Sequence, residues 1–122
     1  MNAIKYKEKI MTTVVEEMLS FMQSVEEDGG DAGFTPDDVE ECKEILFDYV
    51  DALSELENPT DDEILSEVET AVVALNELNE NTDCVLIETV EREAIWEIIQ
   101  DAAVECGLEE EYDDVTEEWR EW

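Results

Sequence analysis

The sequence predicts an all-α fold: a single-domain antiparallel bundle of four long helices followed by a short C-terminal helix. Apolar residues recur at steps of three and four along almost the whole chain, which is the spacing of one face of a helix. Capping and helix-breaking residues separate these runs, and no segment alternates apolar and polar residues as a half-buried strand does. The short predicted loops favour antiparallel neighbours. A length of 122 residues fits one acidic helical domain spanning residues 1–122.

The first two helices are predicted over residues 3–27 and 36–57. The apolar face of the first is marked by Ile4, Met11, Val14, Met18, Met22 and Val25. Three glycines within residues 28–33 predict the loop that ends it. Thr35 is a preferred N-cap and Pro36 suits the first helical position, so the second helix is expected to begin there. Its apolar residues step by 3, 4, 3, 4 and 3 through Val39, Cys42, Leu46, Tyr49, Leu53 and Leu56.

The remaining helices are predicted over residues 61–79, 85–106 and 114–121. Thr60 followed by Glu63 forms a capping-box pattern for the third helix. A polar turn over residues 79–83 separates it from the fourth, which Gly107 is well placed to end. Asp113 or Asp114 is a candidate cap for the short last helix. We expect Trp96 to belong to the core, whereas the pattern leaves the roles of Trp119 and Trp122 open.

The composition excludes several classes of function. The chain has 38 Asp and Glu residues, 6 Lys and Arg residues and no histidine, for a formal net charge of −32. A surface this acidic repels nucleic acid and anionic membranes. Without imidazole, neither a serine or cysteine triad with a histidine base nor most zinc hydrolase sites can form. An EF-hand beginning at Asp28 would place Gly30, Ala32 and Val39 at positions that need carboxylates. We therefore expect no enzyme activity, no metal and no cofactor.

The cysteines indicate a compartment. The chain has an odd number of cysteines, namely Cys42, Cys84 and Cys106, and none of them forms a CxxC motif. Each lies in or beside an apolar run, so we expect them to be small buried residues with free thiols. Free thiols are typical of a reducing environment. The N-terminal segment does not read as a secretory signal, and no run of about 18 apolar residues is present. These features predict a cytoplasmic protein.

Carboxylates also recur with helical spacing, which makes them candidate contact residues. One row on helix 36–57, here called the acidic stripe, consists of Asp37, Glu41, Glu44, Asp48, Asp51 and Glu55. It extends over about 27 Å. Like charges at these spacings destabilise a helix by about 0.2–0.5 kcal/mol per pair. The stripe is therefore either a solvated, solubilising face or a surface that meets a cationic partner. Further candidates are Glu93, Glu97 and Asp101 on the fourth helix and Glu110, Glu111, Asp113 and Asp114 in the tail.

Three stretches of the sequence carry a resemblance to a known family. They are VEECKEIL, ETVEREAIWEIIQDAAVECGL and DDVTEEWREW. On these motifs residues 39–122 resemble an uncharacterised family of small acidic all-helical bacterial proteins, which implies the fold but no activity. In charge and helical class the chain is also similar to immunity proteins that neutralise basic nuclease toxins, and to nucleic-acid mimics that block DNA-binding enzymes.

These observations predict a binding protein without catalysis. The first hypothesis is an immunity protein or inhibitor that covers the cationic surface of a basic protein partner, such as a nuclease toxin or a DNA- or RNA-binding enzyme. The alternatives are a nucleic-acid mimic that inhibits a DNA-binding enzyme, and a salt-adapted soluble or adaptor protein with no dedicated target. No direct contact with nucleic acid or membrane is expected.

Overall fold

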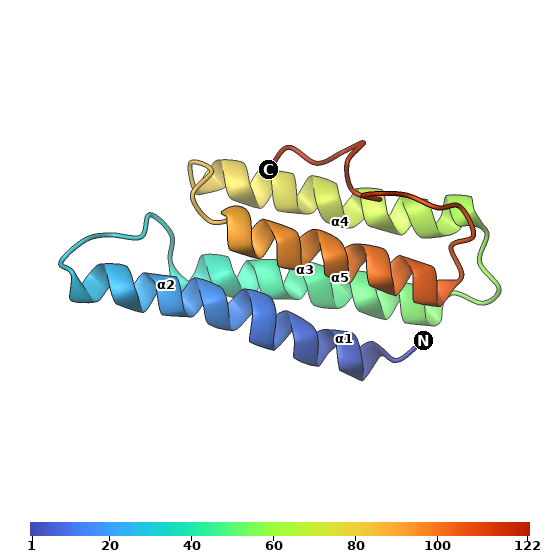
Figure 1. Cartoon of the computed structure of the whole chain (residues 1–122), viewed down its shortest axis with the longest axis horizontal. Coiled ribbons are helices and arrows are strands. Elements are labelled where there is room, and N and C mark those ends of the chain that lie inside the picture. The colour runs from blue at the N-terminus through green and yellow to red at the C-terminus, as the bar shows by residue number, and fades with distance from the viewer.

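Helices account for 69% of the chain and no strand is present, so the prediction of an all-α fold is confirmed. The computed structural model describes all residues from Met1 to Trp122 (Figure 1). Its elements are α1 (Ala3–Ile10), the π-helical segment η1 (Met11–Val15), α2 (Glu16–Glu27), α3 (Pro36–Glu55), α4 (Asp61–Asn81) and α5 (Thr89–Cys106). Because α1, η1 and α2 follow one another without a break, they form one long first helix.

The helices lie alongside one another and share one core. The first helix and α4 each pack against both α3 and α5. In Figure 1 each loop returns the chain along the same long axis, so that consecutive helices run in opposite directions. A single cluster of 28 buried apolar residues fills the space between them. Its largest fully buried members include Ile10, Met18, Leu46, Leu53, Ile64, Leu75, Ile95, Ile98 and Ile99.

The π-helical segment keeps the first helix facing the core along its whole length. The buried residues of this helix are mostly four apart: Tyr6, Ile10, Val14, Met18 and Met22. In an α-helix each step of four residues overshoots a full turn by about 40°, so such a row would rotate away from the core. In η1 the N–H of Glu16 donates to the carbonyl of Met11, five residues back. This wider turn offsets the rotation.

The predicted starts of two helices are confirmed by their capping hydrogen bonds. At the start of α3 the Thr35 hydroxyl accepts from the backbone N–H of Asp38, and the Asp38 carboxylate accepts from the N–H of Thr35 at 2.8 Å. Thr60 and Glu63 make the same reciprocal pair at the start of α4. Each pair satisfies N–H groups that the first helical turn leaves without a partner.

The start of the fourth predicted helix is wrong. It was expected at residue 85, whereas α5 begins at Thr89. Leu86 and Ile87 are buried in the preceding turn instead, where the N–H of Ile87 donates to the side-chain carbonyl of Asn79 at 3.1 Å. Cys84 lies in the same turn with a φ of 62° and is exposed. The expectation that all three cysteines are buried is therefore confirmed only for Cys42, because Cys84 is exposed and Cys106 is half-buried.

The predicted C-terminal helix over residues 114–121 is also wrong, because this segment forms turns. Side chains of the bundle bind its backbone: Asn76 donates to the carbonyl of Trp119 at 2.8 Å and accepts from the N–H of Glu121 at 3.0 Å. Gln100 accepts from the N–H of Val115 at 3.0 Å. The tail thus runs back beside α4 and α5 (Figure 1), and Trp119 and Trp122 pack half-buried against the core.

We predict that Asn76→Ala lowers the free energy of unfolding by about 1–3 kcal/mol. The substitution removes both hydrogen bonds to the tail and leaves two backbone groups without their partners. Urea unfolding measures the loss. Asn81→Ala, at the exposed end of α4, is the matched control, with an expected change within about 0.5 kcal/mol. Equal losses in the two variants would contradict the role given to Asn76.

Candidate protein-binding surface

The acidic residues cover the exterior and are mostly unneutralised. All but six of the 38 carboxylates are exposed; the six are Asp38, Asp51, Asp61, Glu67, Glu91 and Asp114. Only five carboxylates lie within 4.0 Å of a basic nitrogen of the chain. The other 33 have no intramolecular ion pair. The surface therefore carries a large excess of negative charge that the chain itself does not neutralise.

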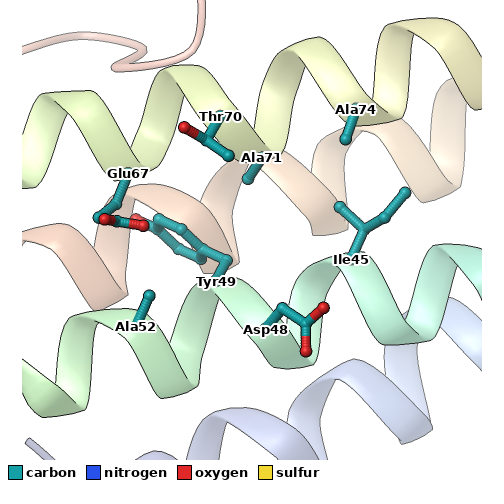
Figure 2. Close-up of a pocket in the computed structure, with 8 residues that line it drawn as sticks. All are labelled: Ile45, Asp48, Tyr49, Ala52, Glu67, Thr70, Ala71 and Ala74. Carbon is teal, nitrogen blue, oxygen red and sulfur yellow. The ribbon is translucent and has the colours of Figure 1, made fainter.

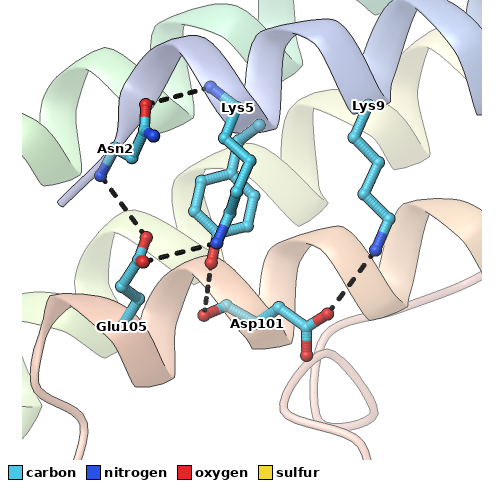
Figure 3. A network of polar contacts seen from close by, with 6 residues as sticks. Asn2, Lys5, Lys9, Asp101 and Glu105 are labelled. Atoms are coloured by element: carbon cyan, nitrogen blue, oxygen red, sulfur yellow. Dashed lines mark hydrogen bonds and ion pairs between the residues drawn. The ribbon is translucent and has the colours of Figure 1, made fainter.

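Five of the six basic residues of the chain form ion pairs within it, and Arg92 forms none. The ion pairs are Lys5–Glu105 at 3.4 Å, Lys7–Asp51 at 2.7 Å, Lys9–Asp101 at 3.8 Å, Lys43–Glu40 at 2.6 Å and Arg120–Asp114 at 2.8 Å. Figure 3 shows Lys5 and Lys9 of α1 reaching across to α5. Beside them the Tyr6 hydroxyl donates to the carbonyl of Asp101 at 3.2 Å. The lysines near the N-terminus thus position α1 rather than form a cationic surface.

The acidic stripe is interrupted at one position. Its exposed members are Asp37, Glu41, Glu44, Asp48 and Glu55. Asp51 is half-buried and pairs with Lys7, because α1 packs along this side of α3. Five of the six carboxylates of the acidic stripe are therefore exposed without an ion pair.

The candidate contact residues on α5 and in the tail also divide into exposed acids without an ion pair and acids that pair within the chain. Glu93, Glu97, Glu110, Glu111 and Asp113 are exposed and form no ion pair. Asp101 is exposed but lies 3.8 Å from Lys9. Asp114 has a side chain only 14% exposed, pairs with Arg120 and accepts from the N–H of Thr116 at 2.9 Å. Asp114 thus holds the tail in its turn, and its prediction as a contact residue has less support than that of the exposed acids.

A further set of carboxylates, on α4, was not predicted. Asp62, Glu63 and Glu67 line depressions on the seam between α3 and α4, and Asp48 of the acidic stripe lines the same seam (Figure 2). The signal in the sequence was a run of acids at the start of α4 together with alanines at positions 71 and 74. Small residues facing a neighbouring helix leave room that larger ones would fill. The acidic surface of α3 therefore continues across the seam onto α4.

One acidic side chain is buried without a basic partner. Glu91, in the first turn of α5, is 8% exposed. Burial raises the pKa of its carboxyl above the usual value, and the negative charges of Glu17 and Glu88 raise it further. The signal in the sequence is its position four residues before the core residue Ile95. Glu91 therefore costs stability when it is ionised.

We predict that Glu91→Gln raises the melting temperature at pH 7 by a few degrees. Because the folded-state pKa is raised, the folded state disfavours the ionised form, and this cost disappears as the pH falls through that pKa. The gain from Glu91→Gln should therefore shrink on acidification. Thermal melts between pH 7 and pH 4 measure it. Glu93→Gln, on the exposed side of the same turn, is the control. It measures how much the melting temperature rises when one negative charge is removed without any change in burial. A gain no larger than that of Glu93→Gln would contradict the prediction.

Apart from its carboxylates, the chain has three thiols and no cluster of residues suited to a metal ion. All three cysteines are free, and burial is the main cause that raises the pKa of the Cys42 thiol to about 12. No group of three or more His, Cys, Asp or Glu side chains is arranged to hold a metal ion. None of the helices is both long enough and apolar enough to cross a membrane. The prominent chemical property of the surface is its negative charge.

Comparison of the chain with protein-family models, with curated proteins and with solved structures gives no match.

Proposed function

We propose that this chain is a non-catalytic binding protein that covers the cationic surface of a nucleic-acid-handling protein, as an immunity protein or inhibitor of a basic nuclease toxin. The observation that carries the proposal is the set of 33 carboxylates without an intramolecular ion pair. Like charges held on a rigid helical surface oppose folding. Binding to a cationic surface would convert that repulsion into attraction.

Nucleic-acid-binding surfaces supply the matching chemistry. They carry Lys and Arg residues that neutralise phosphates, and much of the affinity comes from the release of counterions. Rows of exposed carboxylates on helices can occupy such a surface by the same physics. The exposed members of the acidic stripe and the acids of α4 form one such region, and those of α5 and the tail extend the candidate surface. An inhibitor that mimics nucleic acid in front of a DNA-binding enzyme would use the same chemistry.

Charge alone is not expected to hold the complex. Ion pairs at the rim of an interface contribute about 0–1 kcal/mol each and act mainly on the rate of association. A stable complex needs a desolvated centre with apolar contacts. In this protein the seam between α3 and α4 combines apolar side chains with carboxylates, which makes it the best candidate for that centre.

The rival proposal is an acidic exterior adapted to high salt, with no dedicated partner. The 32 exposed carboxylates favour it, since such exteriors keep proteins soluble at high ionic strength. A chain of that kind would need molar salt to fold. The proposed binding protein should fold at low salt. The three free thiols of the chain fit a reducing compartment, so we propose that the protein is cytoplasmic.

Inhibition of a nuclease tests the proposed function. Genes for immunity proteins usually lie beside the genes of their toxins, so the basic protein encoded next to this chain is the first candidate. We expect DNA or RNA cleavage by that protein to be lost when the chain is added at equal molar amount. Full cleavage activity with the chain in excess, measured under conditions where the two proteins form a complex, would contradict inhibition.

A further inference from the structure

The seam between α3 and α4 contains a groove with an apolar floor. Its cavity volume is about 260 Å³, well above the roughly 30 Å³ that one water occupies in the liquid. The lining residues are Ile45, Asp48, Tyr49 and Ala52 of α3 and Glu67, Thr70, Ala71 and Ala74 of α4 (Figure 2). Three of the eight are alanines, so the two helices leave a trough that is large enough for a side chain and open to solvent.

The charged groups of this groove are two carboxylates, and the Thr70 hydroxyl is already occupied because it donates to the carbonyl of Ser66 at 3.0 Å. Asp48 lines it from α3 and Glu67 from α4, and neither forms an ion pair. Figure 2 shows the Glu67 side chain extending toward the ring of Tyr49. The Tyr49 hydroxyl is already occupied, because it donates to the carbonyl of Ile99 at 2.8 Å. Because Tyr49 is only 3% exposed, an occupant meets mainly methyl groups and two negative charges.

The groove continues along the seam. A second depression, of about 340 Å³, is lined by Leu56, Asp62, Glu63, Ser66 and Glu67. Glu67 is common to both depressions. From Asp62 to Ala74 the two extend over about 18 Å along α4, at 1.5 Å per residue. No lysine or arginine of the chain lines either depression, so the charge of the groove is wholly negative.

We propose that this groove seats an arginine side chain of the basic partner, with its methylene groups over the alanines and its guanidinium group at the Glu67 carboxylate, while Asp48 adds a second negative charge to the lining. The inference rests on the proposed function and names the recognition element within it. Asp62 and Glu63 would face further basic residues of the same partner segment. An apolar side chain alone would remove water from two carboxylates without replacing it, and an anion would be repelled.

Arginine fits this site better than lysine for physical reasons. Its guanidinium group is planar, is less strongly hydrated than an ammonium group, and forms bidentate hydrogen bonds with carboxylates. Lysine carries a compact and strongly hydrated charge that gains less from an apolar trough. A site that recognised only charge would not distinguish the two.

The test compares octa-arginine with octa-lysine, two peptides of equal charge, at 150 mM NaCl. We expect octa-arginine to bind at least fivefold more tightly in titration calorimetry. When octa-arginine is added, the chemical-shift changes of the protein's methyl groups should centre on Ala52, Ala71 and Ala74. Ala74→Leu fills the trough without changing the net charge, and should remove the preference for arginine while leaving octa-lysine binding unchanged. Gln23→Leu, on the exposed surface of α2, is the control and should change neither affinity.

Two further measurements keep the outcome unambiguous. A thermal melt of Ala74→Leu checks that the variant folds, and Glu67→Gln provides a second variant that should reduce the preference for arginine without filling the trough. Equal affinities for the two peptides, or an unchanged preference in both variants, would overturn the arginine site. The proposed function would still hold after that result if both peptides bind and if charge reversal on α3 lowers the affinity for both of them. If neither peptide binds, the arginine site and the cationic-partner proposal both fail.

Discussion

Replacing Glu41, Glu44 and Asp48 with lysine is expected to weaken binding to a basic nuclease partner by more than tenfold, or about 1.4 kcal/mol. All three side chains are exposed and none forms an ion pair, so the fold should persist. The reversal changes the local charge by six units and places cations opposite cations. Asp51 is left unchanged because its pairing with Lys7 holds α1 against α3. Titration calorimetry at two salt concentrations measures both the affinity and its dependence on salt.

A variant of equal net charge separates a specific surface from a general effect of charge. Glu16, Glu26 and Asp28, on the first helix and at its end, are exposed and lie outside the candidate surface. Changing these three to lysine should weaken binding less than threefold. Similar losses in both triple variants would show that the partner responds to net charge alone, and the assignment of the α3 surface would then be wrong.

Replacing Leu46 with alanine is expected to lower the free energy of unfolding by about 3–5 kcal/mol. Leu46 is fully buried at the middle of α3, the helix that packs against both the first helix and α4. The loss combines the transfer of the missing methyl groups with the cavity that remains. A domain has only about 5–15 kcal/mol of stability in total, and in this protein repulsion among the carboxylates also lowers the free energy of unfolding.

Urea unfolding with and without 1 M KCl measures this loss and tests the salt-adapted alternative. The wild-type chain should be folded without added KCl, and salt should raise the stability of both proteins by screening. Leu19→Ala, at a position 42% exposed, is the control and should cost about 0.5 kcal/mol or less. A wild-type chain that folds only in molar KCl would favour the salt-adapted alternative over a dedicated partner.

Local signals in the sequence were sufficient for most of the fold. Thr35 with Pro36 and Thr60 with Glu63 predict the starts of α3 and α4 because capping depends on residues within one helical turn. The apolar spacing likewise predicts the first helix over residues 3–27, and Gly107 lies at the end of α5 with a φ of 123°. Each of these features depends on neighbours within a few positions along the chain.

The errors arose where distant side chains determine the local structure. Val115 and Trp119 have helical spacing, but Gln100 and Asn76 bind the backbone of the tail and hold it in turns. The spacing of the acidic stripe could not show that Lys7 pairs with Asp51, because that contact depends on how α1 packs against α3. The groove on the α3–α4 seam likewise depends on two helices meeting, which no single run of residues reveals.

Capture from an extract of the source cell tests the central claim most directly. The purified chain is immobilised at physiological ionic strength, and bound macromolecules are eluted with increasing salt. We predict that a basic protein is retained, that double-stranded DNA displaces it, and that the triple lysine variant of α3 fails to retain it. If the wild-type chain retains no positively charged macromolecule under these conditions, its acidic surface does not serve a cationic partner.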